Sequence, residues 1–196
     1  MREFDYQRLV IGYHGCDKAV RDRVIQKGDT LRAQPKSYDW LGHGAYFWEH
    51  GPARALEWAK QQKARGKLDQ PAVLGAVLHL GQCFDLLDSD YTDLLGKAYP
   101  DFCQTMRSAG TPIPANEPLH AADSDRLLRK LDCAVVNWTI DQLERDGRLH
   151  FHSVRGVFQE GAAVFPDSGI HQRSHIQIAV RDPDCLLGYF LPSSKA

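Results

Sequence analysis

The sequence predicts an α+β fold built on a mainly antiparallel sheet. Strand-like runs lie at both ends of the chain and enclose two or three helix-like segments. These segments do not follow the regular strand–helix–strand order of a doubly wound parallel sheet. A chain of 196 residues suffices for one core but not for two comfortable ones, and no internal repeat divides it. We therefore expect a single domain over residues 1–196.

Apolar periodicity and turn residues predict the elements of the first half of the chain. The strand-like segments are residues 8–15, 44–48, 72–81 and 83–88. An amphipathic helix is expected over residues 16–31, with Gly28 as its C-terminal stop. A second helix is expected over residues 52–67, because Pro52 suits a first helical turn, where no N–H is needed.

The second half begins with its least regular segment, residues 88–118, which holds four prolines and two glycines. Only a short helix at Tyr91–Leu95 is expected there, with loops around it. Residues 123–147 form the strongest predicted helix, with apolar residues at helical spacing and Gly147 at the end. Strand-like segments follow at residues 153–161, 162–165, 175–180 and 185–191, and residues 192–196 are expected to fray.

Composition and charge exclude several classes of protein. Hydrophobic residues make up 43% and charged residues 25%, which is ordinary for a globular domain. The net charge is −1 and the pI about 6.7, so no overall field draws the chain to nucleic acid or an anionic membrane. No apolar run reaches the roughly 18 residues of a membrane span, and the apolar run near the amino terminus is too short for us to expect a signal peptide there. We expect a cytoplasmic protein without a membrane partner.

The five cysteines form no recognisable site. They are Cys16, Cys83, Cys103, Cys133 and Cys185. They contain no C-x-x-C pair, and their number is odd, so neither a zinc site nor a disulfide framework is expected. We expect free thiols in a reducing compartment.

Several common catalytic motifs are missing. The sequence contains no G-x-S-x-G elbow, no Walker A loop and no G-x-G-x-x-G. His150 and His152 alternate along a strand and resemble a metal-ligand pair, but no third ligand follows at a recognisable spacing, so we predict no metal site. His14 ends a buried strand beside Gly15, which suits either a locally bonded loop histidine or a functional one.

The order of five short motifs carries a resemblance to a known family. They are YHG at 13–15, LRAQP at 31–35, GHGAYF at 42–47, AVLHLG at 76–81 and HIQIAVRDPDCLLGYF at 175–190. In this order the series resembles the catalytic domain of ADP-ribosyltransferases of the diphtheria-toxin and poly(ADP-ribose) polymerase type, in particular minimal bacterial-type members. The resemblance implies a split, mainly antiparallel β core with flanking helices. Residues from about 88 to 147 would be a helical insertion foreign to the family.

The resemblance implies NAD as co-substrate and a role for each matching residue. His14 would bond a ribose hydroxyl of NAD, and the backbone of Gly15 would hold the nicotinamide carboxamide. Arg32 would face the adenosine and phosphate side. Tyr46 would stack on the nicotinamide ring, and Gly44 would belong to the NAD-binding turn before it.

The sequence departs from the family at the catalytic glutamate, where it has Gln177. In the family this glutamate accepts a bond from the nicotinamide ribose and stabilises an oxocarbenium-like transition state. Glutamine keeps an acceptor but loses the charge, which argues against efficient polymer elongation. Glu160 and Glu49 are alternative sources of a carboxylate, and we favour Glu160.

The helix over residues 52–67 departs from the family as well. The register gives Arg54 and Glu57 where the family has a serine and a second stacking tyrosine. Arg54 would either bind a phosphate of NAD or pair with Glu57. Trp58, one residue out of register, would either pack in the core or complete the nicotinamide sandwich, and core packing is the favoured interpretation.

The function expected from the resemblance is mono-ADP-ribosyl transfer from NAD to a protein, a nucleic acid or a small molecule. Arg173 and His175, in or beside the loop before the last strand pair, would contact that acceptor, unless the loop is merely solvated. A toxin or defence effector would suit such a minimal enzyme, with an inhibitory partner protein to restrain it. A catalytically weak NAD-binding module and an NAD glycohydrolase are the alternatives. The related RNA 2′-phosphotransferases require more arginines than Arg32 and Arg54.

Overall fold

The computed structural model describes residues 6–119, 125–145, 147 and 149–193. Its helices and longer strands are β1 (Tyr6–Asp17), α1 (Lys18–Lys27), β2 (Ala45–Glu49), α2 (Pro52–Ala64), β3 (Pro71–Gly81), β4 (Cys83–Asp85), α3 (Ser89–Ser108), α4 (Lys130–Glu144), β7 (Ser153–Phe158), β8 (His175–Val180) and β9 (Leu186–Phe190). Two short strands, β5 (Asn116–Glu117) and β6 (Leu128–Arg129), pair with each other, and a 3₁₀ turn spans Pro183–Cys185.

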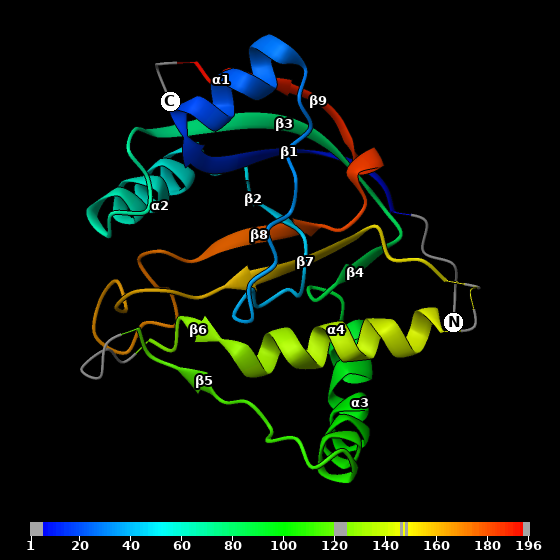
Figure 1. Ribbon diagram of the computed structural model, residues 1–196. Helices are drawn as coiled ribbons and strands as arrows, with labels where there is room; N and C mark the ends of the chain where they lie inside the picture. The colour runs from blue at the N-terminus through cyan, green and yellow to red at the C-terminus, as the bar shows by residue number, and fades with distance from the viewer. Residues whose placement is uncertain (1–5, 120–124, 146, 148, 194–196) are drawn as a thin grey trace.

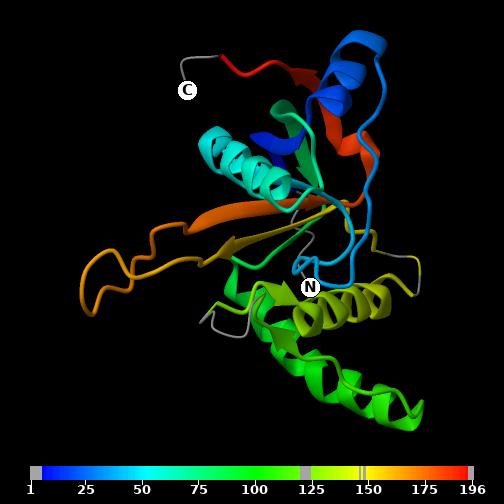
Figure 2. The same cartoon turned by 60° about the vertical axis from the view of Figure 1, so that its left-hand side comes forward.

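The α+β fold and its mainly antiparallel sheet are confirmed. Seven strands form one sheet in the order β4-β7-β8-β2-β1-β3-β9, and only the β4–β7 pair is parallel. Figure 1 shows α1 and α2 beside β1 and β3, with α3 and α4 beyond the opposite edge of the sheet. The connection between β7 and β8 projects from the body as a long loop (Figure 2). Among the described residues, no helix is both long and apolar enough to cross a bilayer.

Local sequence signals explain the first helix. The side chain of Asp17 accepts the N–H of Ala19 at 2.9 Å and caps the amino terminus of α1. Gly28 ends the helix with a φ of 68°, in the left-handed region where a residue with a Cβ is strained. The predicted stop at Gly28 is confirmed.

The prediction of only a short helix at Tyr91–Leu95 was wrong. Helix α3 runs for 20 residues and contains Pro100 in its interior. An internal proline removes a hydrogen bond and costs about 3 kcal/mol, so tertiary packing has to offset it. Tyr91 and Phe102 are buried on one face of α3, and the Phe102 ring meets Trp138 of α4 edge-on, with centroids 6.0 Å apart.

The strongest predicted helix exists but begins later than expected. It starts at Lys130 because the preceding Leu128–Arg129 segment pairs with Asn116–Glu117. The side-chain oxygen of Asn116 also accepts the N–H of Leu131 at 2.9 Å, which satisfies a free donor in the first turn of α4. Residues 123, 124 and 146 of the expected helix and residues 194–196 of the expected frayed tail lie outside the described residues.

The predicted strand at residues 162–165 was wrong. Only an isolated bridge between Ala163 and His171 forms there, and the Phe165 side chain is 60% exposed. The pairing partner that a strand needs is missing because β7 ends at Phe158 and the chain leaves the sheet.

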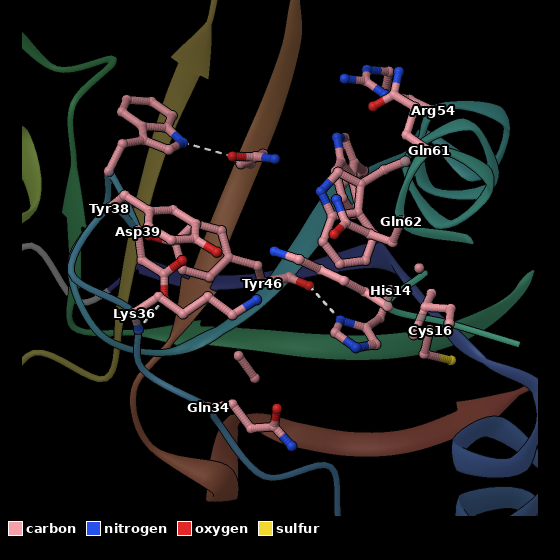
Figure 3. A pocket seen from close by; sticks show the side chains of 18 of the residues that line it. His14, Cys16, Gln34, Lys36, Tyr38, Asp39, Tyr46, Arg54, Gln61 and Gln62 are labelled. Carbon is pink, nitrogen blue, oxygen red and sulfur yellow. Dashed lines mark hydrogen bonds between the residues drawn. The ribbon is translucent and has the colours of Figure 1, made fainter. Parts of the chain in front are cut away.

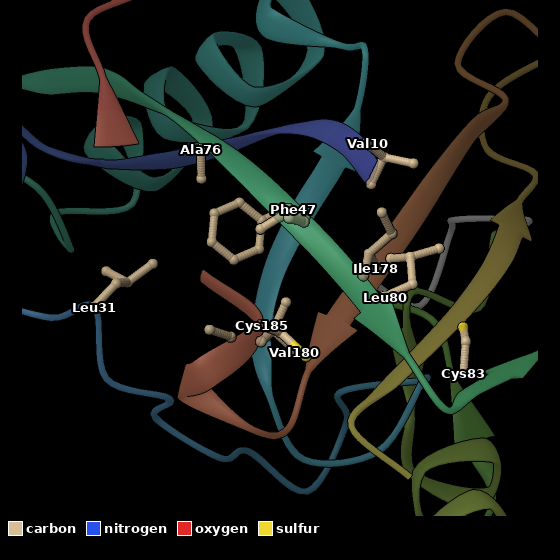
Figure 4. Packing of buried hydrophobic residues seen from close by; sticks show 11 residues of the cluster. Val10, Leu31, Phe47, Ala76, Leu80, Cys83, Ile178, Val180 and Cys185 are labelled. Atoms are coloured by element: carbon tan, nitrogen blue, oxygen red, sulfur yellow. The ribbon is translucent and has the colours of Figure 1, made fainter. Parts of the chain in front are cut away.

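Two clusters of buried side chains hold the layers together. The first lies among β1, β2, β3 and β8, around the fully buried Phe47 and Ile178 (Figure 4). The second joins Phe84 of β4 to Val136 and Ile140 of α4, so part of the insertion packs into the core beside the sheet. The first cluster supports the strands that carry the site described next.

Candidate functional site

The site lies where β1 and β2 separate. The β1–β2 ladder pairs Gly12 with Glu49 and Tyr13 with Trp48, whereas β1 continues to pair with β3 as far as Asp17. The end of β1 is therefore flanked by β3 on one side and by a cleft on the other.

The backbone of Gly15 points into this split. The carbonyl of Ile11 accepts the N–H of His50 on the β2 side, and the N–H of Lys18 bonds to Gln70 on the β3 side. Successive residues of a strand direct their backbone groups to opposite neighbours, and the β1–β3 register is regular here. The N–H and the carbonyl of Gly15 therefore point toward β2, beyond the last rung of the β1–β2 ladder.

Glycine at position 15 is also required by packing. A Cβ there would lie 2.4 Å from the backbone oxygen of Ala55 and 3.1 Å from the ring of Trp58, both in α2. Helix α2 thus rests directly on β1 and forms one wall of the cleft. Gly44 is confined in the same way, because a Cβ there would lie 2.8 Å from the carbonyl oxygen of Val180.

Eight of the predicted site residues line one cleft of about 570 Å³. They are His14, Gly15, Arg32, Gly44, Tyr46, Arg54, Glu160 and Gln177. The volume lies within the range of about 300–1,000 Å³ that is usual for small-molecule sites. Figure 3 shows Arg54 and Gln62 of α2 on one side, with Lys36 and Asp39 of the loop before β2 across from them.

The cleft carries more positive than negative side chains. Its cations are Arg32, Lys36, Arg54, Arg65 and Lys67, and its carboxylates are Asp17, Asp39 and Glu160. An excess of cations in a partly enclosed cleft attracts anionic ligands such as a pyrophosphate.

His14 presents a hydrogen-bond acceptor. Its Nδ1 lies 2.8 Å from the carbonyl oxygen of Tyr46 (Figure 3), and a carbonyl only accepts, so Nδ1 carries the proton and Nε2 a lone pair. Burial lowers the pKa of His14 below its ordinary value of 6.5, so the ring is neutral at pH 7. The ring packs against Phe47, with centroids 5.6 Å apart.

Tyr46 offers its ring rather than its hydroxyl. The hydroxyl accepts the N–H of Leu41 and donates to the carbonyl of Gly42, both at 2.8 Å. Burial, with a further effect from Asp39, raises the pKa of Tyr46 well above its ordinary value of 10.0. The hydroxyl is therefore neutral and already makes two hydrogen bonds, so it cannot act as a general base. The aromatic face of the ring is left to contact a ligand.

Gln177 is held by a residue that the sequence analysis did not single out. The indole Nε1 of Trp40 donates to Gln177 Oε1 at 2.6 Å. An indole N–H only donates, so the carbonyl end of the amide faces Trp40 and the amide nitrogen remains as a donor. Gly156 makes room for Trp40, because a Cβ there would lie 2.7 Å from the indole ring. The carbonyl oxygen expected to serve a ligand is thus already engaged.

Glu160 is a buried, paired carboxylate. Its side chain is 7% exposed, and its Oε2 lies 2.5 Å from Nη2 of Arg54. Arg173 approaches the other oxygen at 3.6 Å. The expected ion pair between Arg54 and Glu57 exists, at 3.4 Å. It is longer than the ion pair that Arg54 makes with Glu160.

Glu49, the other alternative carboxylate, belongs to a different cluster. It bonds to Arg155 at 2.6 and 3.1 Å, and Arg155 also contacts Asp85 at 3.0 Å. Glu49 does not line the cleft, since alternate residues of β2 point to opposite faces. Glu49 is therefore engaged in a structural ion-pair cluster.

Trp58 is partly buried, packs against neighbouring groups and also lines the cleft. Its ring lies 5.7 Å from that of Trp48, and it packs against the Gly15 backbone while lining the cleft. His175 also lines the cleft, next to Trp48. Arg173 lies at the edge of the cleft, where it contacts Glu57 and Glu160.

A third ligand for the His150–His152 pair does exist in the fold. One ligand atom each from His150, His152 and Asp182 lies within 4.8 Å of the others. However, Nδ1 of His152 accepts the N–H of Gln82 at 3.0 Å, so in the neutral ring Nε2 carries the proton. That nitrogen cannot ligate a metal unless the bond to Gln82 is broken.

The cysteines are unsuited to nucleophilic catalysis. All five are free and buried. Burial raises the pKa of Cys16, the one in the cleft, to about 11, so it is a neutral thiol at pH 7.

No family model matches the chain, and no curated protein matches it.

Proposed function

We propose that this protein is an NAD-dependent mono-ADP-ribosyltransferase that cleaves the bond between nicotinamide and ribose. The observation that carries the proposal is the convergence of His14, the Gly15 backbone and Tyr46 on the split between β1 and β2. These residues come from motifs separated by about thirty positions in the sequence.

The cleft offers partners for each part of NAD. The N–H and carbonyl of Gly15 match the carboxamide of nicotinamide, which has both an acceptor and donors. His14 Nε2 would accept a ribose hydroxyl, and Tyr46 would stack on the nicotinamide ring. The surplus of cations, which includes Arg32, suits the pyrophosphate.

The reaction needs stabilisation of positive charge on the ribose as nicotinamide leaves. Gln177 is poorly suited to this. Its side-chain oxygen accepts the Trp40 N–H, so the amide nitrogen, the positive end of the amide dipole, faces the ligand. We assign the role to Glu160, the only carboxylate among the residues first considered for it that lines the cleft. Arg54 and Arg173 hold it beside the cleft in a paired state.

A second candidate is an NAD-binding module with little or no turnover. The orientation of Gln177 and the tight Arg54–Glu160 pair favour it, because both reduce the negative charge available to the ribose. An NAD glycohydrolase, with water as acceptor, is the third.

One assay separates these candidates. Purified protein is incubated with NAD, while binding is followed by titration calorimetry and free nicotinamide by chromatography. A transferase or glycohydrolase releases nicotinamide, and His14→Ala or Tyr46→Ala lowers that release by at least ~10²-fold, the effect of losing a positioned transition-state contact. Binding without release with every acceptor supplied identifies the module, and absence of NAD binding refutes all three.

The proposal extends to the setting of the enzyme. Five unpaired cysteines suit a reducing compartment such as the cytoplasm. The acceptor would be a protein or a nucleic acid. In a toxin or defence effector, an inhibitory partner protein would restrain the activity.

A further inference from the structure

The indole ring of Trp40 lies across two paired strands beside Gln177. Gly156 of β7 and Gln177 of β8 are direct partners in the antiparallel ladder, so position 156 and the Gln177 side chain share one face of the sheet. Gly156 has no side chain, and a Cβ there would lie 2.7 Å from the indole, so the ring rests directly on the strand. From this place the indole N–H reaches Oε1 of Gln177 at 2.6 Å.

Packing fixes the position of the Trp40 ring. Its centroid lies 5.2 Å from that of the Phe158 ring, and it also packs against the second cluster of buried side chains. The next residue, Leu41, is fully buried, and its N–H bonds to the Tyr46 hydroxyl at 2.8 Å. The indole is therefore a fixed donor, to which the Gln177 amide has to adapt.

The other end of the Gln177 amide is free to meet a ligand. Nε2 of Gln177 bonds to no described residue, and it is not one of the buried polar atoms that lack a partner. Gln177 is half-buried and lines the cleft, so this nitrogen is accessible from it. An amide nitrogen only donates and an amide oxygen only accepts. A ligand at this position therefore meets a donor and not an acceptor.

The orientation of the amide cannot be reversed while Trp40 is in place. A reversed amide would put its nitrogen where Oε1 now lies, 2.6 Å from the indole nitrogen. Two donors would then face each other at hydrogen-bond distance, and neither would have an acceptor. A partly buried donor without an acceptor typically costs about 1–3 kcal/mol. Trp40 thus selects one of the two orientations of Gln177.

We propose that Trp40 is a positioning residue that limits the rate of nicotinamide release by holding Gln177 in this orientation. The inference rests on the proposed function. As a donor, Nε2 of Gln177 orients a ribose hydroxyl, but it presents the positive end of the amide dipole to a ribose that becomes positive as nicotinamide leaves with the electron pair. In the reversed orientation, Oε1 would accept from the same hydroxyl and present the negative end.

The hydrogen bond is tested first, in the absence of NAD. The chain has four tryptophans, so a proton–nitrogen correlation spectrum contains four indole N–H signals, and Trp40→Phe identifies the one from Trp40. We expect this proton to exchange with solvent about 3–10-fold faster in Gln177→Leu than in the wild type, the effect of losing one net hydrogen bond. An unchanged chemical shift and exchange rate in Gln177→Leu would overturn the inference.

The effect on the reaction is tested by comparing Trp40→Phe with Trp138→Phe in the full chain. Trp138 is a suitable control because it packs on Phe102 of α3 and does not line the cleft. NAD affinity is measured by titration calorimetry, and nicotinamide release by chromatography with water as acceptor. In that reaction the water oxygen bonds to ribose C1′ as the bond to nicotinamide breaks, and the water proton passes to solvent. Both measurements are repeated with Gln177→Leu added to each variant.

We expect Trp40→Phe to bind NAD as the wild type does and to release nicotinamide about 10-fold faster, because the amide oxygen can then turn to the ribose. The gain should disappear when Gln177→Leu is added, and Trp138→Phe should match the wild type. Release in Trp40→Phe equal to or below that of the wild type would overturn the inference, as would a gain that persists with Gln177→Leu.

Two further outcomes are distinguishable from these. If Trp40→Phe does not fold by circular dichroism, Trp40→Leu takes its place with the same expected results, since it also removes the indole donor. Failure of the proposed function would appear as absence of NAD binding in the wild type and in Trp40→Phe. The indole signal of Trp40 would still respond to Gln177→Leu in that case.

Discussion

The indole of Trp40 donates to the side-chain oxygen of Gln177 at 2.6 Å and thereby determines which end of the amide faces the cleft. Trp40 precedes β2 in the loop that crosses the cleft, whereas Gln177 lies in the middle of β8, 137 positions away. The pair links the loop to β8.

The Trp40–Gln177 pair can be tested by changing its acceptor. Gln177→Glu keeps an oxygen for the Trp40 N–H and adds the negative charge that the ribose cation requires. We expect nicotinamide release to be unchanged or increased in this variant, whereas Gln177→Leu should lower it by about 10-fold or more, since it removes every polar contact. Release in Gln177→Leu equal to that of the wild type, with folding intact by circular dichroism, would remove Gln177 from the site.

The Arg54–Glu160 pair supports both stability and catalysis in this account. Glu160→Gln alone leaves the Arg54 charge nearly buried and without its closest partner, which typically costs about 3–5 kcal/mol of unfolding free energy. The double variant Arg54→Gln, Glu160→Gln should regain much of that stability but should not regain nicotinamide release. Denaturant unfolding and the nicotinamide assay are run on the wild type, the two single variants and the double variant, which together form a double-mutant cycle. Additive losses of stability, or full activity in Glu160→Gln, would contradict the account.

Gly15→Ala tests how closely α2 approaches β1. The new methyl group would lie 2.4 Å from the backbone oxygen of Ala55, which cannot move aside without shifting the helix. We expect a loss of about 1–3 kcal/mol in unfolding free energy and weaker NAD binding. Gly188→Ala, in β9, is the matched control, because a Cβ there meets nothing within 4 Å. Equal stability of the two variants would show that α2 does not rest on Gly15.

Stability should fall as the pH drops below about 6.5. Burial lowers the pKa of both His14 and His175 in the folded protein, so the unfolded chain takes up their protons first. Their contribution to stability is complete above 6.5 and is lost as the pH falls through the lowered pKa values. Urea unfolding between pH 8 and pH 5 should therefore show a shallower decline for His175→Gln than for the wild type. A steeper or identical decline would contradict the buried, neutral state of His175.

The sequence predicted elements best where local signals and burial agreed. The run at residues 8–15 became β1, and Gly28 and Pro52 ended and began helices as expected. Helix α3 was not predicted because Pro100 normally breaks a helix. The cost of this proline is offset by the packing of Phe102 on Trp138, a contact that exists only in the folded chain.

The sequence predicted several of the residues that line the cleft but not the direction of their hydrogen bonds. The residues in the short motifs could be identified because each motif is local in the sequence. The hydrogen bonds that define their chemistry join distant positions, as in Trp40 with Gln177 and Arg54 with Glu160. Neither pair has a spacing signature, so the donor role of Gln177 emerged only from the fold.

A crystal structure of the protein with a non-cleavable NAD analogue would show whether NAD binds at the split between β1 and β2. We expect the nicotinamide carboxamide to form hydrogen bonds with the N–H and carbonyl of Gly15, with the ring stacked on Tyr46 and a ribose hydroxyl bonded to His14. An analogue bound elsewhere, or bound in the cleft with Gly15 uncontacted, would contradict it.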